Sequence, residues 1–110
     1  MSYSVSKNHI KMTRGDTAIF KVSIDYLNTG EPYTPEEGDS IHFTLKKYLS
    51  DRTALFSKNI SIEDMLLEID SEDTLGLSFG RYYYDIQLIK ANGRIDTFIS
   101  DILELTKEVG

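Results

Sequence analysis

Apolar and polar side chains alternate with a period of two along several short stretches of this 110-residue chain. In residues 17–25 every second side chain from the second position on is apolar, namely Ala18, Phe20, Val22 and Ile24. Successive side chains of a β-strand point to opposite faces of a sheet, so this pattern predicts strands with one buried and one solvated face. Helices would need a period of 3.6 instead. The alternation therefore predicts an all-β fold.

Turn-forming residues interrupt the alternation at short intervals, which is typical of a chain built from many short strands. Seven strands are predicted, at residues 8–12, 17–25, 40–47, 54–60, 65–69, 80–90 and 95–106. Residues 28–39 contain both prolines and are expected to form a loop. Residues 70–76 are expected to form a polar corner that can hold a single helical turn.

The last two predicted strands are joined by Asn92-Gly93, a strong hairpin signal. In the second of them Asp101 falls in the apolar phase, which predicts either a bulge near Ser100 and Asp101 or an edge position. Residues 95–109 also fit helical spacing, and so do residues 62–69, where Ser61 and Asp64 resemble a helix cap. The β-rich composition and the hairpin turn favour strands for residues 95–106.

The length and composition predict one globular domain, residues 1–110. Hydrophobic residues make up 40% and charged residues 27% of the chain, which is unlike a disordered protein. A half-buried strand needs a second apolar face to cover it, and no long helix is predicted to supply one. Two packed sheets, a β-sandwich of about seven strands, are therefore expected.

Charge and hydropathy exclude several classes of partner. The net charge is −6 and no segment has the basic character that nucleic-acid binding needs, so no nucleic acid is expected. No apolar run approaches the roughly 18 residues of a membrane span, so no membrane partner is expected. Residues 1–11 contain no apolar core of a signal peptide. The chain has no cysteine, which excludes disulfides and thiolate metal sites.

No residue pattern points to catalysis, so no enzymatic activity, cofactor or metal is expected. His9 and His42 are the only histidines and are not at metal-ligand spacing. The acidic residues between 63 and 73 do not match a calcium-binding loop and are interpreted as a solvated loop. Arg14-Gly15-Asp16 is the integrin-binding tripeptide, but Gly and Asp are also what a tight turn between strands requires, and the turn is favoured.

Several segments together resemble small β-sandwich proteins of phages and prophages of Gram-positive bacteria, including the N-terminal domain of upper baseplate proteins. They are residues 12–17 (MTRGDT), 30–33 (GEPY), 38–45 (GDSIHFTL), 73–75 (DTL), 80–86 (GRYYYDI) and 97–105 (TFISDILEL). The resemblance implies an immunoglobulin-like antiparallel β-sandwich that helps to assemble a tail or baseplate, with a homo-oligomer among the forms it can take. It implies protein partners, a location in the bacterial cytoplasm and then in the virion, and no catalytic residues.

The leading hypothesis is a phage structural module that binds proteins through an exposed sheet face or edge. Ile19, Tyr83 and Phe98 are candidate contact residues, because each is expected opposite the main apolar stripe of its strand. Tyr33 is a fourth candidate, and with Tyr26 and Tyr48 it supports the alternative of a carbohydrate-binding module. Two of the three consecutive tyrosines at 82–84 are expected in the core, one of them in a tyrosine corner. A hydrolase ranks last.

Overall fold

The computed structural model describes residues 3–6, 9–24, 31 and 33–107. This part contains eight strands and one short helix, so the prediction of an all-β fold is confirmed. The strands are β1 (Tyr3–Ser6), β2 (His9–Thr13), β3 (Ala18–Lys21), β4 (Ser40–Lys46), β5 (Phe56–Ile60), β6 (Leu66–Ile69), β7 (Gly80–Ile89) and β8 (Ile95–Thr106), and the helix is α1 (Ser71–Leu75).

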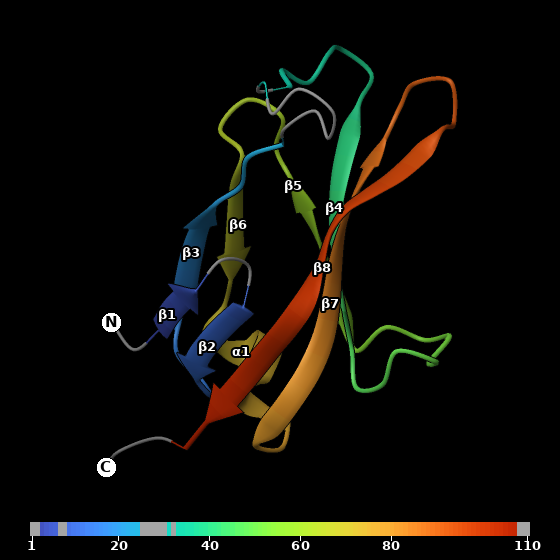
Figure 1. The fold of residues 1–110 in the computed structure, drawn as a ribbon. Helices are drawn as coiled ribbons and strands as arrows, with labels where there is room; N and C mark the ends of the chain where they lie inside the picture. Colours follow the sequence, from blue (N-terminus) through green and yellow to red (C-terminus); the bar gives the residue numbers. More distant parts are fainter. Residues whose placement is uncertain (1–2, 7–8, 25–30, 32, 108–110) are drawn as a thin grey trace.

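The strands form two sheets (Figure 1). Six of them make a curled sheet in the order β1-β2-β8-β7-β4-β5, and β3 pairs with β6 in a second, two-stranded sheet. All pairings are antiparallel except that of β2 with β8, which is parallel. The expectation of a wholly antiparallel fold is wrong at this one pairing. Because β2 and β8 lie at opposite ends of the sequence, no short turn obliges them to run in opposite directions.

The core lies between the inner faces of the two sheets. Buried and half-buried residues alternate along β4 and β7, which places Ile41, Phe43 and Leu45 beside the inward residues of β7. The ring of Phe43 is 5.3 Å from that of Tyr84 and 5.8 Å from that of Phe56, measured between centroids. Ala18, Leu67 and Ile69 cover this core from the two-stranded sheet. The alternation seen in the sequence therefore arises from burial on one face of each sheet.

One strand ends earlier than predicted, and another was not predicted at all. The strand predicted at residues 17–25 ends at Lys21, although Val22 and Ile24 stay buried and Val22 N donates a hydrogen bond to Met65 O at 2.8 Å. Met65 has a φ of 57°, so the backbone of the segment that pairs with Val22 turns sharply just before β6. In contrast, β1 is an additional strand that the sequence did not predict.

The bulge predicted near Ser100 and Asp101 lies earlier, at Phe98. Ile86 pairs with Ile99 and Gln87 pairs with Thr97, so Phe98 is the extra residue of β8. A bulge shifts the phase of a strand, and Ile95 consequently lies on the outer face with 58% of its surface exposed. The helix considered for residues 95–109 is wrong over the described part, because residues 95–106 form β8. The helix considered for 62–69 is likewise wrong over β6.

Asp101 remains on the inner face, opposite Tyr84. Its Oδ1 accepts a hydrogen bond from Ile102 N at 2.7 Å, and its side chain is only half-buried. The pairing of β2 covers β8 only from Leu103 to Thr106, so within the described residues Asp101 has no ladder partner from β2. The edge position suggested by the sequence accounts for Asp101 better than the bulge does.

The polar corner at residues 70–76 forms α1, a single short helix as expected. Asp70 and Asp73 form a reciprocal capping box, in which each carboxylate accepts a hydrogen bond from the other residue's backbone. The buried hydroxyl of Thr74 accepts a hydrogen bond from Gly15 N at 2.8 Å, which fixes the tight turn at residues 14–15 against the corner. Tyr82 Oη donates to Ser78 O at 2.7 Å, so the hydrogen bond expected of a tyrosine corner is present.

Candidate interaction surfaces

The four predicted contact residues do not gather on one surface. Ile19 lies on the outer face of β3 and Tyr83 on the outer face of β7, so the two belong to different sheets. Tyr83 is half-buried between its cross-strand neighbours Ile102 and Lys46. Phe98 packs against the core, and the expectation that it points away from the core is wrong, because the bulge changes the phase of β8 at that residue.

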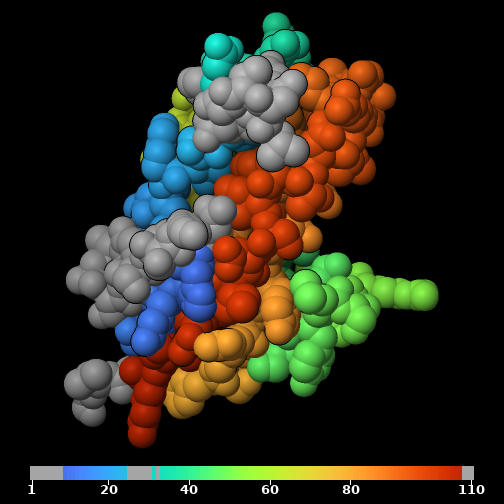
Figure 2. All heavy atoms as spheres, viewed as in Figure 1, coloured from blue at the N-terminus to red at the C-terminus, as the bar shows by residue number. Residues whose placement is uncertain are grey.

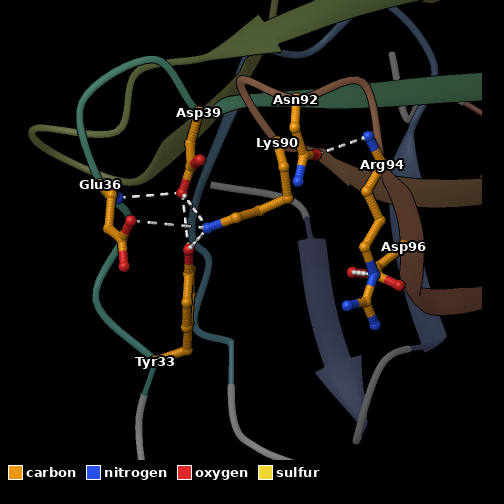
Figure 3. Close-up of polar contacts among 7 residues, drawn as sticks. All are labelled: Tyr33, Glu36, Asp39, Lys90, Asn92, Arg94 and Asp96. Carbon is orange, nitrogen blue, oxygen red and sulfur yellow. Dashed lines mark hydrogen bonds and ion pairs between the residues drawn. The ribbon is translucent and has the colours of Figure 1, made fainter.

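Tyr33 belongs to a polar cluster that joins the loop before β4 to the end of β7 (Figure 3). Asp39 Oδ2 accepts hydrogen bonds from Tyr33 Oη at 2.6 Å, from Glu36 N at 2.9 Å and from Lys90 Nζ at 3.2 Å. Lys90 Nζ also donates to Tyr33 Oη and lies over the tyrosine ring. The side chain of Asp39 is 2% exposed and that of Lys90 is 24% exposed.

These contacts fix the protonation state of the cluster. The hydrogen bonds from Tyr33 and from the backbone of Glu36 lower the pKa of Asp39 below its ordinary value. The hydrogen bonds that Lys90 makes to Tyr33 and Asp39 raise the pKa of Lys90, while burial and the contact with Asp39 raise the pKa of Tyr33. At neutral pH the cluster therefore holds an ammonium, a carboxylate and a neutral phenol.

Such a cluster is suited to holding two segments together. Schiff-base chemistry needs a neutral lysine amine, and a general base works best with a pKa near the working pH. The pKa of Lys90 is instead raised, which keeps its amine protonated, and the pKa of Asp39 is lowered, which moves it further from neutral pH. The neighbouring hairpin is closed by Asn92 Oδ1, which accepts from Arg94 N at 3.0 Å, and by an exposed ion pair between Arg94 and Asp96 at 3.3 Å (Figure 3).

A second polar cluster accounts for part of the acidic stretch. Lys58 of β5 lies 2.7 Å from Asp73 and 3.2 Å from Asp70, measured from Nζ to the carboxylate oxygens. The hydrogen bond to Asp73 is the main reason why the pKa of Lys58 is raised. These two carboxylates are thus paired rather than simply solvated. Within the described residues no three His, Cys, Asp or Glu side chains are grouped as metal ligands would be.

Two surfaces each carry more than one exposed large apolar side chain, while Leu75, Phe79 and Ile95 are exposed elsewhere. The first is the arm, which we define as residues 47–55 between β4 and β5, where Tyr48 is 60% and Leu49 is 70% exposed. The second is the small-sheet face, which we define as the outer residues of β3 and β6, namely Ile19, Lys21, Leu66 and Glu68. Ile19 is 45% and Leu66 is 41% exposed.

Leu49 and Leu66 were not predicted as contact residues. The sequence carries a signal for Leu49, because Tyr48 and Leu49 form an apolar pair between two predicted strands, where turn residues are the rule. Leu66 carries the same signal as Ile19, because it lies opposite the apolar stripe formed by Leu67 and Ile69 in its strand. Of the two other tyrosines of the sugar-binding hypothesis, Tyr48 lies on the arm and Tyr26 lies outside the described residues.

A scan of protein-family models and searches of curated proteins and of solved structures find no match to this chain. Among the described residues, no helix has the length and apolar character needed to cross a bilayer. Function is therefore inferred from the residues of the chain and from their arrangement.

Proposed function

We propose that this protein is a non-enzymatic structural module that makes protein–protein contacts in a phage tail or baseplate. The observation that carries the proposal is the exposure of large apolar side chains on a projecting arm, with Leu49 at 70%. Apolar side chains of this size on a protruding segment gain free energy when a partner buries them. The resemblance of the sequence to phage proteins suggests a tail or baseplate as the assembly that contains such a partner.

The strand order supports an immunoglobulin-like assignment for the sandwich. In that assignment β3 and β6 correspond to strands B and E, while β4, β7 and β8 correspond to C, F and G. The hydrogen bond from Tyr82 to Ser78 O stands at the start of the strand that corresponds to F, where a tyrosine corner is expected. Domains of this kind commonly act through their surfaces and loops.

The position of the tyrosines weighs against the sugar-binding alternative. Tyr33 precedes β4 and Tyr48 follows it, so the seven residues of that strand separate them by about 20 Å at 3.4 Å per residue. The hydroxyl of Tyr33 is also engaged by Asp39 and Lys90. The two side chains therefore do not share one sugar-binding platform.

The proposal is tested on particles released from the bacterium that carries this gene. Mass spectrometry of purified particles is expected to detect the chain together with tail proteins, and a gold-labelled antibody is expected to mark the end of the tail. An abundant cytosolic protein serves as the control for carry-over. Detection of the chain only in the fraction without particles would contradict the proposal.

A further inference from the structure

The arm and the small-sheet face carry complementary charge. The arm and the adjoining end of β4 have three cations, Lys46, Lys47 and Arg52, against one carboxylate, Asp51. The small-sheet face and the turn before β6 have three exposed carboxylates, Glu63, Asp64 and Glu68, against one ammonium, Lys21. The first set surrounds three large exposed apolar side chains, Tyr48, Leu49 and Leu55, and the second surrounds two, Ile19 and Leu66. The two surfaces thus match in both charge and hydrophobic character.

The arm has a defined shape. Asp51 Oδ2 accepts a hydrogen bond from Tyr48 N at 3.1 Å and Asp51 N donates to Tyr48 O at 3.1 Å, which closes a turn with Leu49 at its tip. Below the turn, Lys47 Nζ lies 4.5 Å from the centroid of the Tyr82 ring and 3.5 Å from Arg81 O. A turn held in place in this way loses less conformational entropy when it docks than an unconstrained loop would.

The small-sheet face is equally well defined. In the β3–β6 register Ile19 lies opposite Glu68 and Lys21 lies opposite Leu66, so the two apolar residues are diagonal neighbours. Lys21 Nζ donates to Asp64 O at 2.6 Å, which draws the only ammonium of this face toward the turn before β6. Ile19 and Leu66 therefore form a small apolar spot bordered by carboxylates.

The two surfaces lie on opposite sides of the molecule. The arm projects at one side in Figure 1, whereas β3 and β6 lie at the other side. In Figure 2 the green segment that contains the arm protrudes at the right, and the light blue segment that contains β3 lies at the left of the same view. A contact between the arm of one copy and the small-sheet face of the next would leave one surface of each kind unoccupied at the two ends of the pair.

We propose that the arm docks on the small-sheet face of a second copy of this chain. Leu49 and Tyr48 would cover Ile19 and Leu66, while Lys46 and Arg52 would face Glu63 and Glu68. Because the two docking surfaces differ, the contact is head-to-tail and adds further copies into a ring or filament. The proposed function leaves the protein partner unnamed, and this contact names it as another copy of the chain. The biological role of the contact rests on the proposed function.

Two single variants test this contact. Leu49→Asp disables the arm and Leu66→Asp disables the small-sheet face, while Leu75→Asp places the same change at an exposed leucine outside both surfaces. The wild-type protein and Leu75→Asp are expected to gain mass with concentration in sedimentation velocity, and to lose mass with added salt. Each of the first two variants is expected to remain monomeric. Circular dichroism checks that all of them are folded.

Mixing the two disabled variants gives the decisive result. The intact arm of Leu66→Asp can still dock on the intact face of Leu49→Asp, so the mixture is expected to form a pair of one copy each and nothing larger. Absence of that pair would overturn the head-to-tail contact, and so would wild-type protein that stays monomeric at about 1 mM. If such a monomeric chain is still found in particles, self-association fails while the proposed function stands.

Discussion

At the scale of single residues, Asp39 is a buried polar group held by several partners. Three hydrogen bonds converge on its Oδ2, and it connects the loop before β4 to Lys90 at the end of β7. A buried carboxylate is tolerated only when such partners replace its hydration. The sequence did not identify this group, because Asp39 and Lys90 are 51 residues apart and no local spacing connects them.

Asp39→Asn is expected to lower the melting temperature by several degrees at neutral pH, because the amide removes the charge that Lys90 requires. Asp96→Asn serves as the control, since Asp96 forms only an exposed ion pair with Arg94 and its loss should change little. Thermal unfolding followed by circular dichroism measures both. Equal melting temperatures for the two variants would contradict the role assigned to Asp39.

The pH dependence of the same variant has a defined sign. The pKa of Asp39 is lowered in the folded protein from an ordinary value of 3.8. Its contribution to stability is therefore complete above that value and is lost as the pH falls through the folded pKa. The stability gap between wild type and Asp39→Asn should be constant from about pH 6 to pH 8 and should shrink in acid. A gap that widens on acidification would contradict this sign.

At the scale of elements, the hairpin between β7 and β8 depends on Gly93, whose φ is 91°. An alanine there has space, because no heavy atom lies within 4 Å of the added Cβ, so only the backbone conformation is strained. Gly93→Ala should destabilise the protein by about 1–2 kcal/mol. Gly76→Ala is the matched control, because Gly76 has equal space and a φ of −87°, and it should be neutral or slightly stabilising.

Urea unfolding measures both glycine variants through their midpoints. Equal midpoints would contradict the left-handed conformation of Gly93. The comparison separates backbone strain from side-chain packing, since neither added methyl group meets a neighbour.

The strands and the pairing of β7 with β8 were largely predictable from the sequence, whereas the other pairings were not. Alternating burial in β4 and β7 produces a direct sequence signal, and the hairpin turn is marked by Asn92 and Gly93. The bulge at Phe98 was misplaced because it is defined by the register of β8 against β7, which alternation alone does not specify. β1 was missed because Tyr3–Ser6 contains only two large apolar residues among serines.

At the scale of the whole molecule, the two surfaces proposed for self-association depend on tertiary structure. Leu49 is exposed because the arm leaves the sheet between β4 and β5, and Leu66 is exposed because β6 turns Leu67 and Ile69 inward. The sequence predicted Ile19 as a contact residue from its position opposite the apolar stripe, and it lies on the small-sheet face. It could not place the arm and this face on opposite sides of the fold.

We propose that this protein acts through contacts of its exposed apolar surfaces. A dilution series of ¹H–¹⁵N correlation spectra tests this claim most directly, because it reports every backbone amide at once. With rising concentration, signals are expected to shift in residues 46–53 and in residues 17–21 and 63–68, while those near Lys90 stay constant. Shifts that are absent from both surfaces, or that centre on Tyr33 and Lys90, would contradict the account.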